Sequence, residues 1–420
     1  MQATPTLRFL LKNKALNYPQ FRSYLAQRFC LILALNMQTT IVSYMLYQLT
    51  RDQLSLGMLG LAEVIPAVGF SIFSGHFVDR REKRGLLLQC IGGYVLLSVF
   101  FLLLALPAIQ KGIGIQGITW LIYFGTFIGG ALRAFVSPTN FALMGGLIPR
   151  RLYAGASTWS SSAWQFGAVV GPLLGGMLLA FTGFATSLGA VSISAIIAFS
   201  VVSSLKKQPS TNIQHEPFWQ SLKEGLQLVF RTEIILAALA LDMFAILFGG
   251  AIALLPVYAD DILKVGEVGY GWLRAATGIG SVLTLLGLSI LPLRTNPGIK
   301  LLFCIAGFGV TTIIFGISTS FILSFAMLVL GGAFDAVSVV IRGTILQLYT
   351  PTNMRGRVAA VNTMFISSSN EIGALESGIT AKMMGTVPAV VFGGCMTILV
   401  VIVTWFKSPT LKKLDLTKTS

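Results

Sequence analysis

The stretch GHFVDRREKR, residues 75–84, places six charged side chains between two long apolar runs. The upstream run, residues 54–74, has Glu63 as its single charged residue, and the downstream run, residues 85–106, has none. Apolar runs of about 20 residues are each long enough to span the hydrocarbon core of a bilayer. Residues 75–84 therefore form a short loop between two membrane helices.

The loop also predicts how the chain is oriented in the membrane. Its basic side chains, Arg80, Arg81, Lys83 and Arg84, lie within a few residues of the two helix ends. Short loops rich in Lys and Arg stay on the cytoplasmic side of a membrane. We therefore expect this loop in the cytoplasm, and the alternation of the remaining helices then places both chain termini there too.

The composition is that of a protein that crosses the membrane many times. Of the 420 residues, 55% are hydrophobic and only 11% are charged, which excludes a soluble globular protein of ordinary composition. The net charge of +15 is spread over short loops and tails, so it indicates no nucleic-acid partner. Single, scattered cysteines and the lack of an ATP-binding or His-Glu-x-x-His motif predict no cofactor, no metal site and no enzymatic activity.

Twelve apolar runs are predicted to be membrane helices, in two sets of six. They cover residues 21–49, 54–78, 85–106, 118–148, 154–181, 184–205, 233–258, 266–291, 298–318, 321–349, 357–382 and 387–407. The one long polar connection, residues 206–225, predicts a cytoplasmic linker between an N-terminal bundle, 1–205, and a C-terminal bundle, 226–420. At the end of the linker, FWQSLKEGLQLVF has the spacing of an amphipathic helix lying on the membrane surface.

The two sets of helices are internal repeats. A shift of 202 residues aligns GGALRAF, residues 129–135, with GGAFDAV, residues 331–337, and Gly176 with Gly378. A shift of 211 aligns Gly60 with Gly271 in an earlier pair of helices. Two six-helix halves related by an axis along the membrane normal are the architecture of secondary transporters with a binding site near the midplane.

The loop residues Gly75, Asp79, Arg80, Lys83 and Arg84 resemble the signature Gly-x-x-x-Asp-Arg-x-Gly-Arg-Arg of the major facilitator superfamily. Glu82 stands where that family usually has glycine, which leaves open how the chain turns there. With its helix 4 and helix 11 segments, the chain is similar to the branch of enterobactin exporters and macrolide efflux proteins. The resemblance implies a monomeric transporter of the bacterial inner membrane that exports a small amphiphilic molecule in exchange for protons.

Two other functions stay open at this point: a proton-coupled importer of a small polar solute, and a membrane scaffold or receptor that transports nothing. An importer of sugars is expected to need more hydrogen-bonding side chains in its cavity than the sequence offers. A scaffold has no reason to keep carboxylates at membrane depth, because each charged group there costs about 2.5 to 3.5 kcal/mol to insert.

Charged residues inside the membrane helices are the candidates for transport chemistry, with structural ion pairs as the alternative. The candidates for proton coupling are Glu371, Asp335, Asp242 and Glu63. Glu371 is preferred because its own helix has no basic residue within two turns, whereas Asp335 has Arg342 two turns away.

The resemblance adds residues for the substrate and for the conformational change. In this superfamily helices 1, 4, 7 and 10 line the central cavity, and Trp164 on helix 5 would supply apolar wall. The implied cavity residues are Gln38, Arg133, Asn140, Arg342 and Trp164. The signature loop is a conformational latch in this superfamily, which assigns that role to Gly75, Asp79, Arg80 and Arg84.

Overall fold

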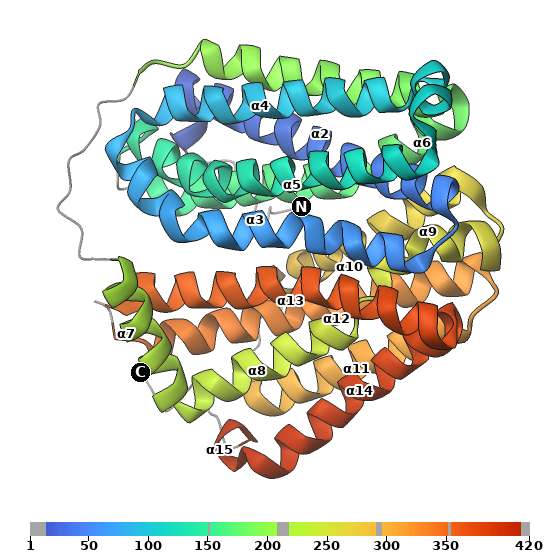
Figure 1. Cartoon of the computed structure of the whole chain (residues 1–420). Coiled ribbons are helices and arrows are strands. Elements are labelled where there is room, and N and C mark those ends of the chain that lie inside the picture. The colour runs from blue at the N-terminus through green and yellow to red at the C-terminus, as the bar shows by residue number, and fades with distance from the viewer. Residues whose placement is uncertain (1–13, 150–151, 208–217, 291–295, 352–353, 413–420) are drawn as a thin grey trace, which may run out of the picture. The chain divides into compact units, whose positions relative to one another are not determined.

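The fold was examined in a computed structural model that describes residues 14–149, 152–207, 218–290, 296–351 and 354–412 (Figure 1). The N-terminal part forms η1 (Lys14–Asn17), α2 (Pro19–Thr50), α3 (Gln53–Arg80), α4 (Lys83–Leu104), α5 (Pro107–Leu147) and α6 (Tyr153–Ser203). The following part forms α7 (Phe218–Arg231), α8 (Glu233–Phe248), η3 (Ala251–Leu254), α9 (Leu255–Val257), η4 (Tyr258–Ile262) and α10 (Gly266–Ile290). The chain ends with α11 (Pro297–Ile317), α12 (Phe321–Tyr349), α13 (Arg355–Met384), α14 (Thr386–Lys407) and α15 (Pro409–Lys412).

The predicted all-α membrane fold is confirmed, and most predicted helix ends fall within two residues of the observed ones. In the described residues, ten helices are long and apolar enough to cross a membrane. Helix α6 combines two predicted runs, because Gly183, with φ 78° and ψ 178°, interrupts its helical backbone without ending the element. Helix α13, which carries Asn370, Glu371 and Glu376, is not among the ten. The full number of twelve stays a prediction.

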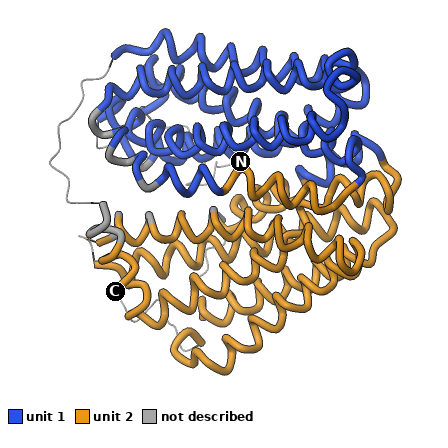
Figure 2. Tube along the Cα trace, in the orientation of Figure 1, with its two compact units in different colours: residues 1–51, 65–214, 266–275 blue, residues 52–64, 215–265, 276–420 orange. Residues whose placement is uncertain are grey.

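The chain divides into two compact units (Figure 2). Unit 1 comprises residues 1–51, 65–214 and 266–275, and unit 2 comprises 52–64, 215–265 and 276–420. The first part of α3 therefore belongs to unit 2, and the first part of α10 belongs to unit 1. The division into two sequential six-helix bundles stays a proposal.

Glycines explain why these two helix segments group as they do. In unit 2, a Cβ atom at Gly60 of α3 would lie 2.9 Å from the Cβ of Ala374 on α13. In unit 1, a Cβ atom at Gly176 of α6 would lie 2.6 Å from the carbonyl oxygen of Glu267 on α10. Small residues allow membrane helices to approach this closely. Gly60 and Gly271 are equivalent in the repeat. Gly271 forms the α10 side of the contact with α6, where a Cβ atom added to it would lie 2.8 Å from the carbonyl oxygen of Pro172.

Helix α6 also packs closely along α2 through a second row of glycines. A Cβ atom at Gly167 would lie 2.9 Å from the Cγ2 of Ile32, and one at Gly171 would lie 2.7 Å from the Cβ of Asn36. These glycines are four residues apart and so lie on one face of the helix. Their role in the described structure is to hold α2 and α6 together within unit 1.

Helix α7 is the predicted amphipathic helix, but its apolar face packs on protein. Val229 is fully buried in a cluster with Ile235 and Leu239 of α8 and with Val358 and Val361 of α13. The side chain of Glu224 forms an ion pair with Arg357 of α13. Helices α8 and α13 therefore cover the Val229 side of α7, and a position of this helix on the membrane surface stays a prediction.

Candidate transport site

The turn between α3 and α4 shows why glutamate replaces glycine in the signature loop. Glu82 has φ −65° and ψ 122°, an ordinary extended conformation that does not require glycine. Its carboxylate accepts hydrogen bonds from the backbone N–H groups of Arg84 (2.9 Å) and Gly85 (2.6 Å). These bonds satisfy two of the free N–H groups at the start of α4 and place a negative charge at the positive end of its dipole.

Lys83 and Arg84 bind the carboxyl ends of two other helices. The Nζ of Lys83 donates to the carbonyl oxygens of Val78 (2.6 Å) and Arg81 (3.0 Å), where α3 ends. Arg84 donates from Nε to the carbonyl oxygen of Val202 (3.3 Å) and from Nη2 to that of Ser203, where α6 ends. Cations at helix carboxyl ends are stabilising. Of the four latch candidates, Arg84 thus anchors α4 to α6 inside unit 1.

The other latch candidates, Gly75, Asp79 and Arg80, belong to the last two turns of α3. Their side chains lie outside the part of the chain that the structure describes. A latch role for these three residues therefore stays a prediction.

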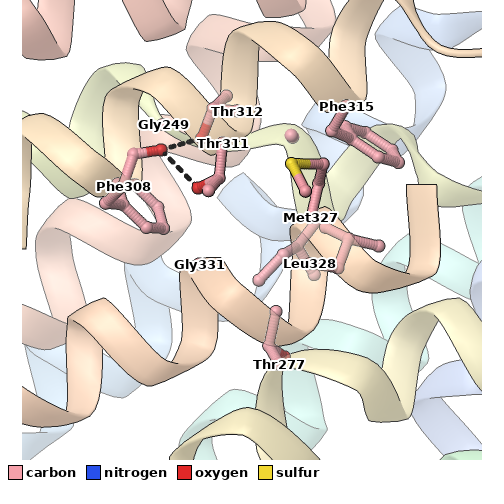
Figure 3. A pocket seen from close by; sticks show the side chains of 11 residues that line it. Gly249, Thr277, Phe308, Thr311, Thr312, Phe315, Met327, Leu328 and Gly331 are labelled. Atoms are coloured by element: carbon pink, nitrogen blue, oxygen red, sulfur yellow. Dashed lines mark hydrogen bonds between the residues drawn. The ribbon is translucent and has the colours of Figure 1, made fainter. Parts of the chain in front are cut away.

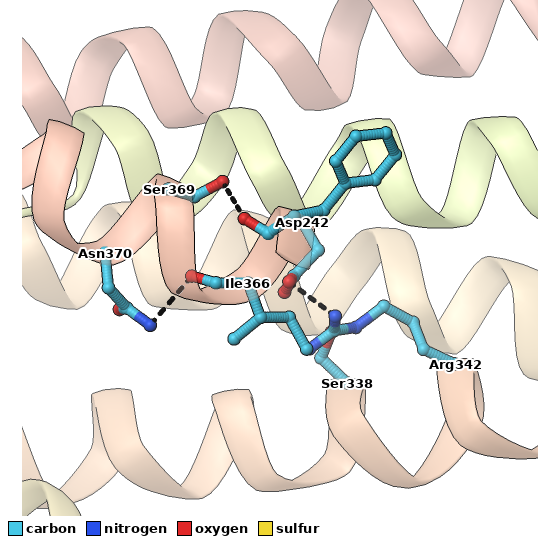
Figure 4. Close-up of polar contacts among 7 residues, drawn as sticks. Asp242, Ser338, Arg342, Ile366, Ser369 and Asn370 are labelled. Atoms are coloured by element: carbon cyan, nitrogen blue, oxygen red, sulfur yellow. Dashed lines mark hydrogen bonds and ion pairs between the residues drawn. The ribbon is translucent and has the colours of Figure 1, made fainter. Parts of the chain in front are cut away.

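Unit 2 contains a buried charge cluster contributed by α8 and α12 (Figure 4). Asp242 of α8 and Arg342 of α12 form an ion pair, and each residue is only 3% exposed. The Nε of Arg342 also donates to the Oγ of Ser338, one helical turn away (3.3 Å). Asp335 lies two turns from Arg342 on the same face of α12 and interacts electrostatically with both Arg342 and Asp242. The cluster therefore contains two carboxylates and one guanidinium, with Asp242 in the direct ion pair.

Helix α13 packs against α8 next to this cluster, but much of its polar run is bonded to its own backbone. A Cβ atom at Gly373 would lie 2.8 Å from the carbonyl oxygen of Leu247 on α8. Ser369 donates to the carbonyl oxygen of Phe365 (2.7 Å), and Asn370 donates to that of Ile366 (3.0 Å). These two polar groups therefore have partners within α13, as Figure 4 shows.

Glu371 and Glu63 belong to the contact between α13 and α3 in unit 2. Both residues are half-buried. The Oε2 atom of Glu371 lies 3.4 Å from the position that a Cβ atom would take at Gly60, one turn before Glu63 on α3. Both carboxylates thus belong to the helix pair that carries the close glycine contact.

The cavity candidates of unit 1 fall into two groups. Asn140 of α5 is buried and accepts a hydrogen bond from the Nε2 of Gln27 on α2 (2.8 Å), which ties these helices together. Gln38 is also buried, whereas Arg133 and Trp164 are exposed. An arginine deep in a membrane helix avoids lipid. A place for Arg133 in a central cavity stays a prediction.

A small apolar pocket lies beside the point where α8 ends (Figure 3). Its lining includes Phe308 and Phe315 of α11 and Met327 and Leu328 of α12. The hydroxyl groups of Thr311 and Thr312, which also line the pocket, donate to the carbonyl oxygen of Phe308 (2.9 and 2.8 Å). The pocket therefore offers an apolar wall rather than free hydrogen-bonding groups.

Sequence analysis missed two contacts, Asp242 with Arg342 and Gln27 with Asn140. The partners lie on different helices, 100 and 113 positions apart. The sequence held one indication of these contacts: in each pair, both polar residues lie on helices that are expected to line the central cavity. The indication was clearest for Asp242 and Arg342, which have opposite charges.

Apolar membrane helices with repeat-related glycine contacts and a buried charge cluster define a multi-pass transporter of the major facilitator fold. The family of transmembrane secretion effectors matches residues 16–420, so the chain belongs to this family. Solved structures show the same fold. A POT family transporter in complex with a thioalcohol-conjugated peptide has a TM-score of 0.70 at 14% identity and covers 94% of this chain and 96% of its own. A D-xylose–proton symporter has a TM-score of 0.69 at 15% identity and covers 95% and 100%.

Curated relatives are similar over most of their length. The enterobactin exporter EntS of Escherichia coli O1:K1 is 26% identical over 369 residues, which are 87% of this chain and 86% of the exporter. The enterobactin exporter EntS of Shigella flexneri is 27% identical over the same shares. The protein is therefore a multi-pass membrane transporter of the major facilitator superfamily, with a small molecule as its substrate.

Proposed function

We propose that this transporter exports an amphiphilic, siderophore-like small molecule across the bacterial inner membrane in exchange for protons. The observation that carries the direction and the substrate class is the similarity to enterobactin exporters over 87% of the chain. The basic loop at residues 80–84 supports a cytoplasmic location of that loop and of both termini. We expect the protein to act as a monomer.

The charge cluster of unit 2 is our proposed site of proton coupling. With Asp242 and Asp335 both ionised, the cluster has one negative charge in excess, which is unfavourable in a buried site. Binding of one proton makes it neutral. Because Asp242 holds the direct ion pair with Arg342, we assign the exchangeable proton to Asp335. Glu371 and Glu63 remain further coupling candidates at the contact between α3 and α13.

Proton coupling follows from how protonation of Asp335 changes the charges around Arg342. A protonated Asp335 leaves Arg342 balanced by Asp242 alone, whereas an ionised Asp335 competes for the same guanidinium. The two protonation states therefore favour different arrangements of α8 and α12. A ligand shifts a conformational equilibrium only as far as its affinities for the two conformations differ. Competition between Asp335 and Asp242 for Arg342 gives the proton different affinities for the two arrangements.

The test is transport in inside-out membrane vesicles that contain the protein, with enterobactin as the probe. An exporter that exchanges substrate for protons accumulates enterobactin inside vesicles with an acidic lumen and loses this ability when a protonophore collapses the gradient. Vesicles without the protein are the control. Release of preloaded enterobactin driven by an acidic lumen would identify an importer and contradict the proposal.

A further inference from the structure

Unit 1 carries nearly all of the net positive charge of the protein. It contains 17 of the 30 Lys and Arg residues but only three of the 15 Asp and Glu residues, Asp79, Glu82 and Glu267. The sequences of α2, α4, α5 and α6 contain no Asp or Glu at all. In unit 2, by contrast, the buried arginine Arg342 is paired with an aspartate.

Arg28 of α2 shows the consequence most clearly. This half-buried arginine donates from Nε to the carbonyl oxygen of Ser160 on α6 (3.2 Å) and from Nη1 to the hydroxyl of Tyr24 (3.5 Å). Tyr24 is in turn hydrogen-bonded to the Oγ of Ser160 (3.1 Å). All of these partners are neutral. A guanidinium inside a membrane helix carries a large free-energy cost unless an anion compensates its charge.

Two buried polar atoms, on residues that neighbour Arg28 and Ser160 in sequence, lack a partner within the described part of the chain. They are the Oε1 of Gln27, whose residue is 0% exposed, and the indole Nε1 of Trp159. Gln27 precedes Arg28 on α2, and Trp159 precedes Ser160 on α6. A buried polar atom without a partner costs about 1 to 3 kcal/mol.

We propose that Tyr24, Arg28 and Ser160 form a loading site for an anionic oxygen group of the exported molecule, for which a carboxylate serves as the simplest probe. This inference rests on the proposed export function and adds an organic anion as the substrate class. Arg28 lies nine residues, or about 14 Å, from the first residue of α2. Because the amino end of α2 is expected on the cytoplasmic side, the site lies in the half of the helix from which an exporter takes up its substrate.

The test is equilibrium binding to the purified full-length protein of 2-naphthoate and of its uncharged analogue 2-naphthamide. The wild-type protein should bind the carboxylate in preference to the amide. Arg28→Gln should weaken carboxylate binding about tenfold or more, since hydrogen bonds to charged groups contribute that much, and should leave amide binding unchanged. Arg28→Lys, which keeps the charge, should retain part of the affinity. Arg22→Gln is the matched control, because Arg22 is an exposed arginine on the same helix.

Three results would each overturn the loading site. The first is equal carboxylate affinity of the wild type and folded Arg28→Gln, the second is equal binding of carboxylate and amide by the wild type, and the third is no saturable binding of the carboxylate. If Arg28→Gln does not fold, Tyr24→Phe removes one partner of Arg28 and should still weaken binding of the carboxylate selectively. Export and loading can fail separately. If the protein exports enterobactin with the proton gradient but binds the carboxylate equally well without Arg28, only the loading site is refuted. If carboxylate binding depends on Arg28 but no gradient-driven transport occurs, only the export function is refuted.

Discussion

Replacing Asp242 and Asp335 together by asparagine is expected to destabilise the protein far more than the two single replacements added together. In either single variant, one carboxylate of the cluster remains within two helical turns of Arg342 or paired with it, and we expect it to serve as the counter-ion. In the double variant it is left as a buried cation without one, which typically costs about 3 to 5 kcal/mol. The measurement is thermal unfolding in detergent of the wild type, both single variants and the double variant.

A compensating variant makes this prediction specific to charge. Arg342→Met in the double-variant background removes the uncompensated cation and should recover much of the lost stability, because apolar replacements of buried ion pairs are often tolerated. Ser338→Ala is the matched control on α12, since it removes a neutral partner of Arg342. Additive losses of stability in the double variant, with no recovery in the triple variant, would show that the two aspartates do not share Arg342.

Alanine at Gly280 or Gly332 is expected to disrupt the packing of α10 against α12. A Cβ atom at Gly280 would lie 1.8 Å from the carbonyl oxygen of Val329, and one at Gly332 would lie 2.0 Å from that of Thr277. Both distances are to backbone atoms, so one helix must move away from the other. We expect each substitution to cost about 3 kcal/mol or more and to lower the yield of folded protein.

The same helices provide the controls for this prediction. A Cβ atom at Gly287 of α10 or at Gly343 of α12 would meet nothing within 4 Å. Alanine at these positions should be neutral or slightly stabilising, because alanine favours helix more than glycine does. The measurement is the fraction of monodisperse protein in size-exclusion chromatography, together with the unfolding temperature. Similar behaviour of all four variants would mean that α10 and α12 do not approach as closely as described.

The sequence predicted the helices well because their signal is local. A run of about 20 apolar residues has few alternatives to a membrane helix, and its ends are set by charges and prolines close to it. The predicted run 321–349 and helix α12 (Phe321–Tyr349) agree fully. The repeat also predicted which glycines are equivalent, and Gly60 and Gly271 indeed occupy equivalent helix contacts in the two units.

Interactions between helices were harder to predict, because they depend on how each helix is rotated about its axis. Periodicity gives little help when nearly every side of a helix is apolar. The pairing of Asp242 with Arg342 could therefore not be read from either helix alone. Helix α7 illustrates the converse problem: its amphipathic pattern was clear, but the same pattern suits a membrane surface and a protein surface. In the described residues, α8 and α13 cover the Val229 side of α7, so protein takes up part of its apolar face.

Exchange of substrate for protons through Asp335 is measured by following lumenal pH while enterobactin enters inside-out vesicles. The wild-type protein should make the acidic lumen more alkaline in step with enterobactin uptake. Asp335→Asn should exchange labelled for unlabelled enterobactin without any change in pH, and Glu371→Gln in parallel shows whether the second site contributes. Enterobactin uptake by the wild type without proton movement would show that the protein does not exchange substrate for protons. Unchanged proton movement in Asp335→Asn would show that Asp335 is not the proton carrier.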